Sequence, residues 1–274
     1  MFETIWRKKD NLKYFDSPEG KIAFIENDKG FFCLGGNAAL KNFPKEKKPI
    51  CGCYINKETA DKLEGHFHIR EIGQVYKTNL SKFNFKKPYI NRIKNYAARN
   101  SYQFEYVMLA DDVLFNEIKA VEKSSLRKKT LPRLGFLLSP PSQKYCEWAI
   151  VREKGVIVAV LGFNKVNQES YYLDNIISLK HRFAVDYALV STLKFFKENK
   201  VQEVDLGLVP FQEIKSKKNI FYWGQYFNWL YSSKGLAHFK KTYTTKKEPA
   251  FCYFDKRYSL TSQIYQLAKL HLKG

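Results

Sequence analysis

The stretch from Tyr231 to Pro249 combines residue types that could hold an anion. It contains five lysines among aromatic side chains, and Ser232, Ser233 and Gly235 interrupt the aromatic segment that precedes it. Lysines beside a glycine and aromatic walls can bind a negative group while their aliphatic stems pack on apolar surface. The same composition suits a solvated basic hairpin at a sheet edge, where lysine discourages strand pairing. Composition leaves both interpretations of this cationic turn open.

A second group of basic residues surrounds the start of a predicted helix. Lys86 and Lys87 precede the helix expected at Pro88–Asn100, and Arg92 lies within it, away from the apolar stripe of the helix. This basic patch suits contact with a phosphate backbone, and a solvated helix face explains it equally well.

The segment Lys180–Asp186 bears on a coenzyme A site. In acetyltransferases a glycine-rich loop in the matching place holds the coenzyme A pyrophosphate with its backbone N–H groups. Here the segment keeps the basic residues Lys180 and Arg182 but has no glycine. Because side chains obstruct the close approach of backbone to a pyrophosphate, coenzyme A is disfavoured. A bulkier phosphate donor held by side chains fits better.

Three aspartates at the ends of predicted elements are candidates for proton transfer: Asp174, Asp186 and Asp205. A carboxylate can act as a general base, although helix capping explains Asp186 about as readily. The sequence shows no P-loop, dinucleotide fingerprint, Gly-x-Ser-x-Gly elbow or acidic Mg²⁺ site.

The net charge restricts the class of partner. With 47 Lys and Arg against 27 Asp and Glu, the 274-residue chain carries a formal charge of +20. This excess attracts phosphate-rich partners, which are nucleic acid or an anionic membrane face. No secretory signal opens the sequence, and no segment approaches the run of about 20 apolar residues that spans a membrane. We expect a cytoplasmic protein, peripheral at most to the inner face of the membrane.

The five cysteines are expected to be free thiols, because their number is odd and no secretory signal is present. Cys51-Gly-Cys53 and His66-Phe-His68 could each place two ligands on one face of a strand. Their spacing fits no common zinc pattern. We predict neither a metal nor a cofactor.

The hydrophobic pattern predicts alternating strands and helices. Strands are expected at 21–25, 31–34, 50–55, 73–79, 104–109, 147–152, 156–164, 169–176, 201–208 and 250–254, and helices at 59–64, 88–100, 112–128, 183–200 and from 259. In the second half, three antiparallel strands, a helix, a parallel strand and another helix follow the order of an acetyltransferase-type (GNAT) domain. The first half has similar elements. We predict an α/β (α+β) fold of tandem GNAT-like domains with mixed sheets flanked by helices. The domains are residues 1–135 and residues 136–274, and the second carries the active site.

Two stretches of the second half carry a resemblance to a known family. Val204-Asp-Leu-Gly-Leu-Val-Pro210 is similar to a strand that ends in Asn-Leu-Gly-Met-Ala-Pro. Ser233-Lys-Gly-Leu-x-x-Phe-Lys240, with Tyr243 and Glu248-Pro249 after it, is similar to a block Ser-x-Lys-Gly-Leu-x-x-Tyr-Lys that closes in Trp-Glu-Pro. Both belong to the C-terminal synthase domain of the lysylphosphatidylglycerol synthetase (multiple peptide resistance factor) family, which the chain resembles as a stand-alone soluble protein.

The chain departs from the family pattern at three positions. The family has an acidic residue followed by Arg three positions later, whereas Asp174 is followed by Ile177. Lys247 stands in the place of a Trp, and Thr245 in the place of a Pro.

The resemblance implies a transferase that moves an aminoacyl group, with lysyl as one candidate, from aminoacyl-tRNA to the hydroxyl of a phosphatidylglycerol-type lipid. In this mechanism a carboxylate, Asp186 or Asp205, deprotonates the acceptor, and Lys234 and Lys240 hold phosphate or stabilise the oxyanion. The expected substrate-binding residues are Lys86, Lys87, Arg92, Asp174, Lys180, Arg182 and Tyr243.

Other interpretations stay open on the sequence. The acceptor could be a peptide or a small molecule, the donor could serve another GNAT-type acyl transfer, or the chain could be a non-catalytic RNA- or membrane-binding module. The aromatic residues Trp223, Phe227 and Trp229 could line an acyl-chain path or belong to the core.

Overall fold

The computed structural model describes residues 12–18, 20–43, 48–125, 146–211, 213–222 and 233–273. The chain divides into two compact units that each combine distant segments. The first unit holds Met1–Tyr76, Leu208–Thr242 and Lys247–Gly274, and the second holds Lys77–Gly207 and Tyr243–Lys246. The predicted domain boundary between residues 135 and 136 lies outside the described residues, so this division of the sequence stays a prediction.

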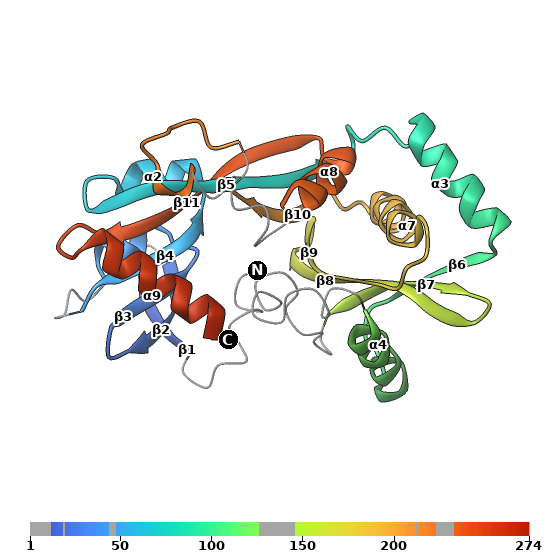
Figure 1. Cartoon of the computed structure of the whole chain (residues 1–274), viewed down its shortest axis with the longest axis horizontal. Helices are drawn as coiled ribbons and strands as arrows, with labels where there is room; N and C mark the ends of the chain where they lie inside the picture. The colour runs from blue at the N-terminus through green and yellow to red at the C-terminus, as the bar shows by residue number, and fades with distance from the viewer. Residues whose placement is uncertain are drawn as a thin grey trace. The chain divides into compact units, whose positions relative to one another are not determined.

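The first unit is built on a mixed sheet (Figure 1). Its strands lie in the order β1 (Leu12–Ser17), β2 (Gly20–Asn27), β3 (Gly30–Leu34), β4 (Ile50–Ile55), β11 (Lys246–Asp255) and β5 (Phe67–Asn79). β1, β2 and β3 pair antiparallel, β3 and β4 pair parallel, and β11 returns antiparallel to β4.

Both faces of this sheet are covered. The 3-10 helix η1 (Ala38–Lys41) and α2 (Lys57–Leu63) pack on one face with Leu40, Leu63 and Tyr253 in the core. On the other face, Leu260 and Ile264 of α9 (Leu260–Lys273) pack against Cys51 and Phe254. Apolar burial on two faces explains why β4 is a continuous apolar run.

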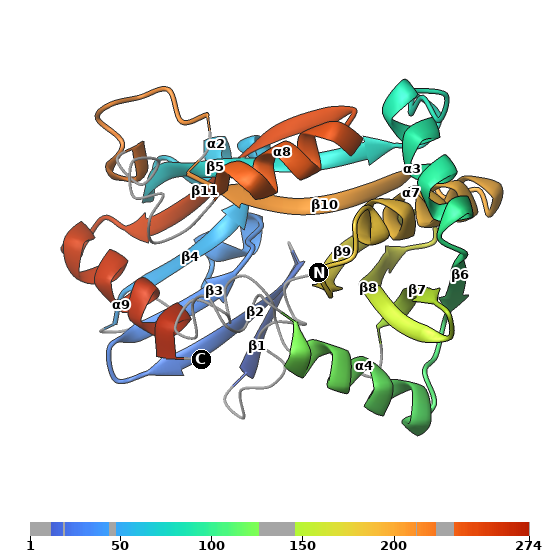
Figure 2. The same cartoon turned by 45° about the vertical axis from the view of Figure 1, so that its right-hand side comes forward.

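The second unit has the strand order β10 (Glu203–Pro210), β9 (Ser170–Ser178), β8 (Val156–Asn167), β7 (Glu147–Glu153) and β6 (Tyr102–Val107). β6 to β9 pair antiparallel, and β10 lies parallel to β9. The parallel connection runs through α7 (Ala184–Glu198). Figures 1 and 2 show α7 and α3 (Pro88–Arg99) on one face of the sheet and α4 (Asp112–Ser124) on the other.

This order confirms the predicted fold class, an α/β fold with mixed sheets and flanking helices, and the acetyltransferase-type succession of elements. Local signals explain the helices. Pro88 occupies the first turn of α3, where its missing N–H costs nothing. Asp111 caps α4 by accepting from Leu114 N at 2.8 Å. β5 begins earlier than expected, at Phe67.

The prediction of a cationic turn after Ser232 is wrong, because Ser233–Tyr243 forms the helix α8. Leu236, Lys240 and Tyr243 follow one another at helical spacing and are buried or half-buried, so they give the helix an inward face. Gly235 lies in the first turn, and the alanine, leucine and lysines after it favour a helix. Gly235 therefore does not interrupt the helix.

The five cysteines are all free thiols and buried. No cluster of three or more potential metal ligands occurs within the ranges that the structure describes. In the same ranges, none of the helices has the length and the apolar composition needed to cross a membrane.

Candidate active site

The start of α7 is held in an unusual backbone conformation. Phe183, the residue before the helix, has φ 58° in the left-handed region and makes no side-chain cap. For a residue other than glycine this conformation costs about 1 to 3 kcal/mol and persists only where its surroundings fix it. The rings of Tyr89 and Tyr96 pack edge-on against Phe183, with centroids 5.9 and 5.4 Å away.

Two arginines complete this cluster. The guanidinium carbons of Arg92 and Arg182 lie 5.3 and 5.0 Å from the centre of the Phe183 ring, and Arg182 also lies 5.7 Å from Tyr96. The Tyr102 hydroxyl donates to the Arg182 carbonyl at 3.0 Å and fixes the loop.

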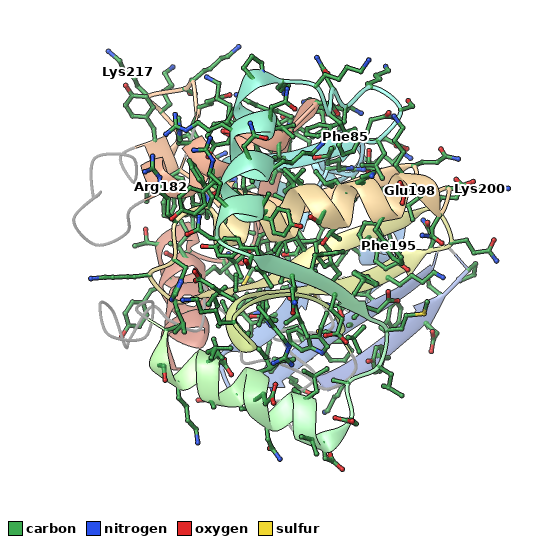
Figure 3. The ribbon with its side chains drawn as sticks, turned by 90° about the vertical axis from the view of Figure 1, so that its right-hand side faces the viewer. Phe85, Arg182, Phe195, Glu198, Lys200 and Lys217 are labelled. Carbon is green, nitrogen blue, oxygen red and sulfur yellow. The ribbon has the colours of Figure 1, made fainter. Side chains whose placement is uncertain are left out.

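Both guanidinium groups are exposed, and Figure 3 shows Arg182 at the beginning of α7, with Glu198 and Lys200 at its other end. Exposed cations stacked on rings can contact phosphate groups, and such rings can stack on bases. We call Arg92, Arg182, Phe183 and Tyr96 the arginine–aromatic cluster.

Asp186, in the first turn of α7, accepts hydrogen bonds from two tyrosines. The Tyr243 hydroxyl donates to Asp186 Oδ1 at 2.5 Å, and the Tyr89 hydroxyl donates to the same oxygen at 3.1 Å. Among the described residues no donor reaches Oδ2, so this oxygen is available for a substrate hydroxyl.

We call Asp186, Tyr243 and Tyr89 the carboxylate triad. Both of its tyrosines remain protonated at neutral pH. Burial, together with the negative charge of Asp186, raises the pKa of Tyr243 far above its usual value and raises that of Tyr89 as well. The hydroxyls are therefore fixed donors, and Asp186 is the acceptor. Tyr89 packs on Phe183, so the triad adjoins the arginine–aromatic cluster.

The backbone around Tyr243 is anchored to the end of β5. Thr78 Oγ1 donates to the Tyr243 carbonyl at 2.7 Å, and Thr244 Oγ1 donates to the Lys77 carbonyl at 2.7 Å. With a fully buried ring and a fixed backbone, the Tyr243 hydroxyl has little freedom to move. Such rigidity is what a proton-transfer site needs.

Lys240 lies three residues before Tyr243 on α8. Its side chain is only 6% exposed, and Nζ donates to the Leu208 carbonyl at 3.1 Å. A buried ammonium needs such partners, so the lysine fastens α8 to Leu208, which belongs to the same unit. The side chain of Lys234, the other expected catalytic lysine, lies outside the described residues, as do Trp223, Phe227 and Trp229.

The other two aspartates lie together in the second unit. Asp205 Oδ1 accepts from Gly207 N at 2.6 Å, where Gly207 adopts φ 84°, so this carboxylate stabilises a bend in β10. Asp174 lies on β9, and its Oδ2 is 3.8 Å from Cys146 Sγ. Burial and the negative charges of Asp205 and Asp174 raise the pKa of Tyr172, and Asp205 of β10 pairs with Tyr172 of β9.

The remaining expected residues flank the arginine–aromatic cluster in sequence. Lys87 precedes α3, and its Nζ lies 5.2 Å from the centre of the Phe83 ring. Lys86 donates its backbone N–H to Asn84 Oδ1 at 2.8 Å, and Lys180 is exposed between β9 and α7. Contact of these three lysines with phosphate groups stays a prediction.

Sequence reasoning missed Tyr89 and the role of Phe183. A signal was present, because Tyr89, Arg92 and Tyr96 follow one another at i, i+3 and i+7 and so form a second stripe on α3. The left-handed conformation of Phe183 had no signal, since the segment contains no glycine.

The fold has acetyltransferase-type topology. The family model described as phosphatidylglycerol lysyltransferase, C-terminal, matches residues 38–254. The chain belongs to this family.

Solved structures agree in fold. L-PGS from Bacillus licheniformis superposes with a TM-score of 0.77 at 17% identity. The match covers 96% of this chain and 90% of the L-PGS chain. A second match is the C-terminal domain of a protein described as a lysylphosphatidylglycerol synthetase from Agrobacterium fabrum. Its TM-score is 0.75 at 16% identity, and the match covers 96% of this chain and 89% of that chain. The match to FemX has a TM-score of 0.59 at 12% identity and covers 96% of this chain and 93% of that chain. No curated protein matches the sequence.

Proposed function

We propose that this chain transfers an aminoacyl group from aminoacyl-tRNA to the hydroxyl group of a phosphatidylglycerol-type lipid. The observation that carries the proposal is a half-buried carboxylate, bound by two tyrosines, next to two exposed arginines stacked on aromatic rings. Membership of the family supports the class of reaction.

The chemistry is an exchange of one ester for another. The lipid hydroxyl attacks the carbonyl carbon of the aminoacyl ester, and Asp186 Oδ2 takes its proton. The bond from this carbon to the ribose oxygen of the tRNA then breaks, and that oxygen receives the proton from Asp186. One ester forms as one breaks, so the reaction needs no ATP and leaves Asp186 unchanged.

The tyrosines position the base. Tyr243 and Tyr89 both donate to Oδ1, which directs Oδ2 toward the substrate and keeps the carboxylate in one orientation. Lys234 is proposed to hold a phosphate group or to stabilise the oxyanion of the tetrahedral intermediate. Lys240 is proposed as a structural residue, because its Nζ already donates to the Leu208 carbonyl. Asp205 is proposed as a structural residue, because its Oδ1 already accepts from the backbone.

The arginine–aromatic cluster is proposed to bind the single-stranded end of the tRNA. The guanidinium groups suit phosphates, and the Tyr96 and Phe183 rings suit bases. Lys86, Lys87 and Lys180 would extend the contact along the backbone. The charge of +20 suits an enzyme that binds a polyanionic tRNA and an anionic lipid, with the lipid met at the inner face of the membrane.

The test is transfer of label from radiolabelled aminoacyl-tRNA to phosphatidylglycerol liposomes. We expect chloroform-soluble label with the natural chain and a loss of at least 100-fold with Asp186→Asn. Label in a water-soluble product instead of the lipid would show a peptide or small-molecule acceptor. Absence of label with a full set of aminoacyl-tRNAs would refute the proposal.

A further inference from the structure

The segment that follows β10, residues 213–222, carries a group of exposed lysines on the surface of the first unit. Lys215, Lys217 and Lys218 are all exposed and close together in sequence. Figures 1 and 2 show this orange segment as a loop that stands out from the sheet of its unit, and Figure 3 shows Lys217 extending away from the ribbon. We call residues 213–222 the basic loop. A projecting loop of this charge can approach a flat, negatively charged surface.

Buried residues hold the basic loop in place on both sides of its lysines. Ile214 is 3% exposed and Asn219 is 7% exposed. Asn219 Nδ2 donates to the Glu71 carbonyl at 2.6 Å, and the Asn219 N–H donates to the Ser216 carbonyl at 3.0 Å and closes a turn. Because these anchors fix the backbone, the lysines between them are presented together, and binding a partner orders little further chain.

Neighbouring acids do not cancel the charge of the basic loop. Glu213 pairs with Lys247 at 2.5 Å, and Glu71 accepts from its own neighbour in β5. Within the ranges that the structure describes, no acidic side chain forms an ion pair with Lys217 or Lys218. The charges of these two lysines are therefore available for an anionic partner.

Apolar side chains adjoin the lysines. Ile220 is 48% exposed, and Phe221 beside it is half-buried and stacks on Phe211 with the ring centroids 6.2 Å apart. In sequence, the nine residues Trp223-Gly-Gln-Tyr-Phe-Asn-Trp-Leu-Tyr231 follow directly. Trp and Tyr favour the boundary between water and lipid acyl chains, and lysines next to apolar side chains are typical of segments that lie on a membrane surface.

A membrane fits the basic loop better than RNA does. Arginine is the residue that suits paired contacts with phosphate and stacking on bases, and residues 213–222 contain no arginine. Lysine is a point charge that anionic headgroups attract without a fixed geometry. An exposed isoleucine gains nothing from a phosphate backbone, whereas acyl chains would remove its apolar surface from water.

We propose that Lys215, Lys217, Lys218 and Ile220 form a docking surface for an anionic phospholipid membrane. The ammonium groups lie among the headgroup phosphates, and Ile220 enters the boundary between headgroups and acyl chains. The proposal rests on the function above for the reason that the chain meets a membrane, but docking can be measured without any transfer.

Sedimentation with vesicles measures the docking directly. The natural chain should bind vesicles of phosphatidylcholine mixed with phosphatidylglycerol and should bind pure phosphatidylcholine vesicles far more weakly. A lysine near an anionic surface gives about a fivefold gain in affinity, so Lys217→Gln combined with Lys218→Gln should weaken binding about 25-fold. Ile220→Ser should weaken binding about fivefold, because roughly half of this residue is exposed and can be covered.

The matched control combines Lys123→Gln with Lys165→Gln. Both lysines are exposed on the second unit, and their replacement removes the same two charges from the chain. The control should bind the mixed vesicles within about twofold of the natural chain. Equal losses in the loop variant and the control would show that net charge alone drives binding and would overturn the proposal.

Two further measurements separate docking from RNA contact and from catalysis. The double variant of the basic loop should bind tRNA with the natural affinity; weaker tRNA binding with unchanged vesicle binding would assign the loop to RNA. It should also transfer at the natural rate to a short-chain phosphatidylglycerol that dissolves as monomers, while kcat/KM on vesicles falls about 25-fold. If the natural chain yields no lipid product at all, the function above fails, and sedimentation still decides about the loop.

Discussion

Replacing Tyr243 by Phe removes one hydroxyl from the carboxylate triad and keeps the buried ring. The hydrogen bond to Asp186 is 2.5 Å long, its acceptor is a carboxylate, and the tyrosine is 0% exposed. Hydrogen bonds to charged groups contribute about 1.5 to 3 kcal/mol, so we expect the free energy of unfolding to fall by about that amount. Urea denaturation with an unchanged m-value would measure it.

The same variant should lose activity. Without Tyr243 the carboxylate keeps only the Tyr89 bond at 3.1 Å and can rotate, so kcat should fall by about 10- to 100-fold, or about 1.4 to 2.7 kcal/mol in the barrier. Tyr89→Phe is the matched control. Its hydroxyl makes the longer bond and the residue is 37% exposed, so both losses should be smaller.

The pH dependence gives a further check on Tyr243. Its pKa is raised in the folded chain, so the stabilisation by its protonated hydroxyl is complete below about pH 10, the pKa of an unfolded tyrosine, and declines as the pH rises further. The reasoning fails if Tyr243→Phe is as active as the natural chain, or if Tyr89→Phe is the more damaging of the two.

Three further predictions concern the arginines, the second carboxylate and the thiols. Arg92→Gln and Arg182→Gln should each lower the slope of log K for tRNA binding against log salt concentration by about 0.7. Lys200→Gln, at the far end of α7, should leave the slope unchanged. Equal slopes in all three variants would show that the arginines do not contact the tRNA. Asp205→Asn should transfer within about twofold of the natural rate because it keeps an acceptor for Gly207 N, whereas Asp205→Ala should lose about 1 to 3 kcal/mol of stability; inactivity of a folded Asp205→Asn would make Asp205 the base. The five thiols should resist Ellman's reagent at pH 8 until urea unfolds the chain, because they are buried and burial raises the pKa of Cys33 to about 12; rapid labelling of the folded chain would contradict this.

Local signals made most of the fold predictable. Asn27–Gly30 marks the turn between β2 and β3, Pro88 marks the start of α3, and Asp111 marks the start of α4. α8 was not predictable from Gly235, because a glycine in the first turn of a helix is tolerated and tertiary burial of Lys240 and Tyr243 stabilises the helix.

The candidate site was predictable only in part. Asp186, Arg92, Arg182 and Tyr243 could be named from charge, position and resemblance, and the structure brings Tyr243 to Asp186. Distant contacts cannot be derived from local pattern. The role of Tyr89 depends on contact between segments far apart in sequence, since Tyr89 on α3 meets Asp186 on α7.

The most direct test of the proposed transfer is the labelled-lipid assay run with three forms of the chain. The natural chain should move label from aminoacyl-tRNA into chloroform-soluble phosphatidylglycerol, Asp186→Asn should lose at least 100-fold, and Asp205→Asn should stay within about twofold. No labelled lipid from the folded natural chain, or full activity in Asp186→Asn, would contradict the account.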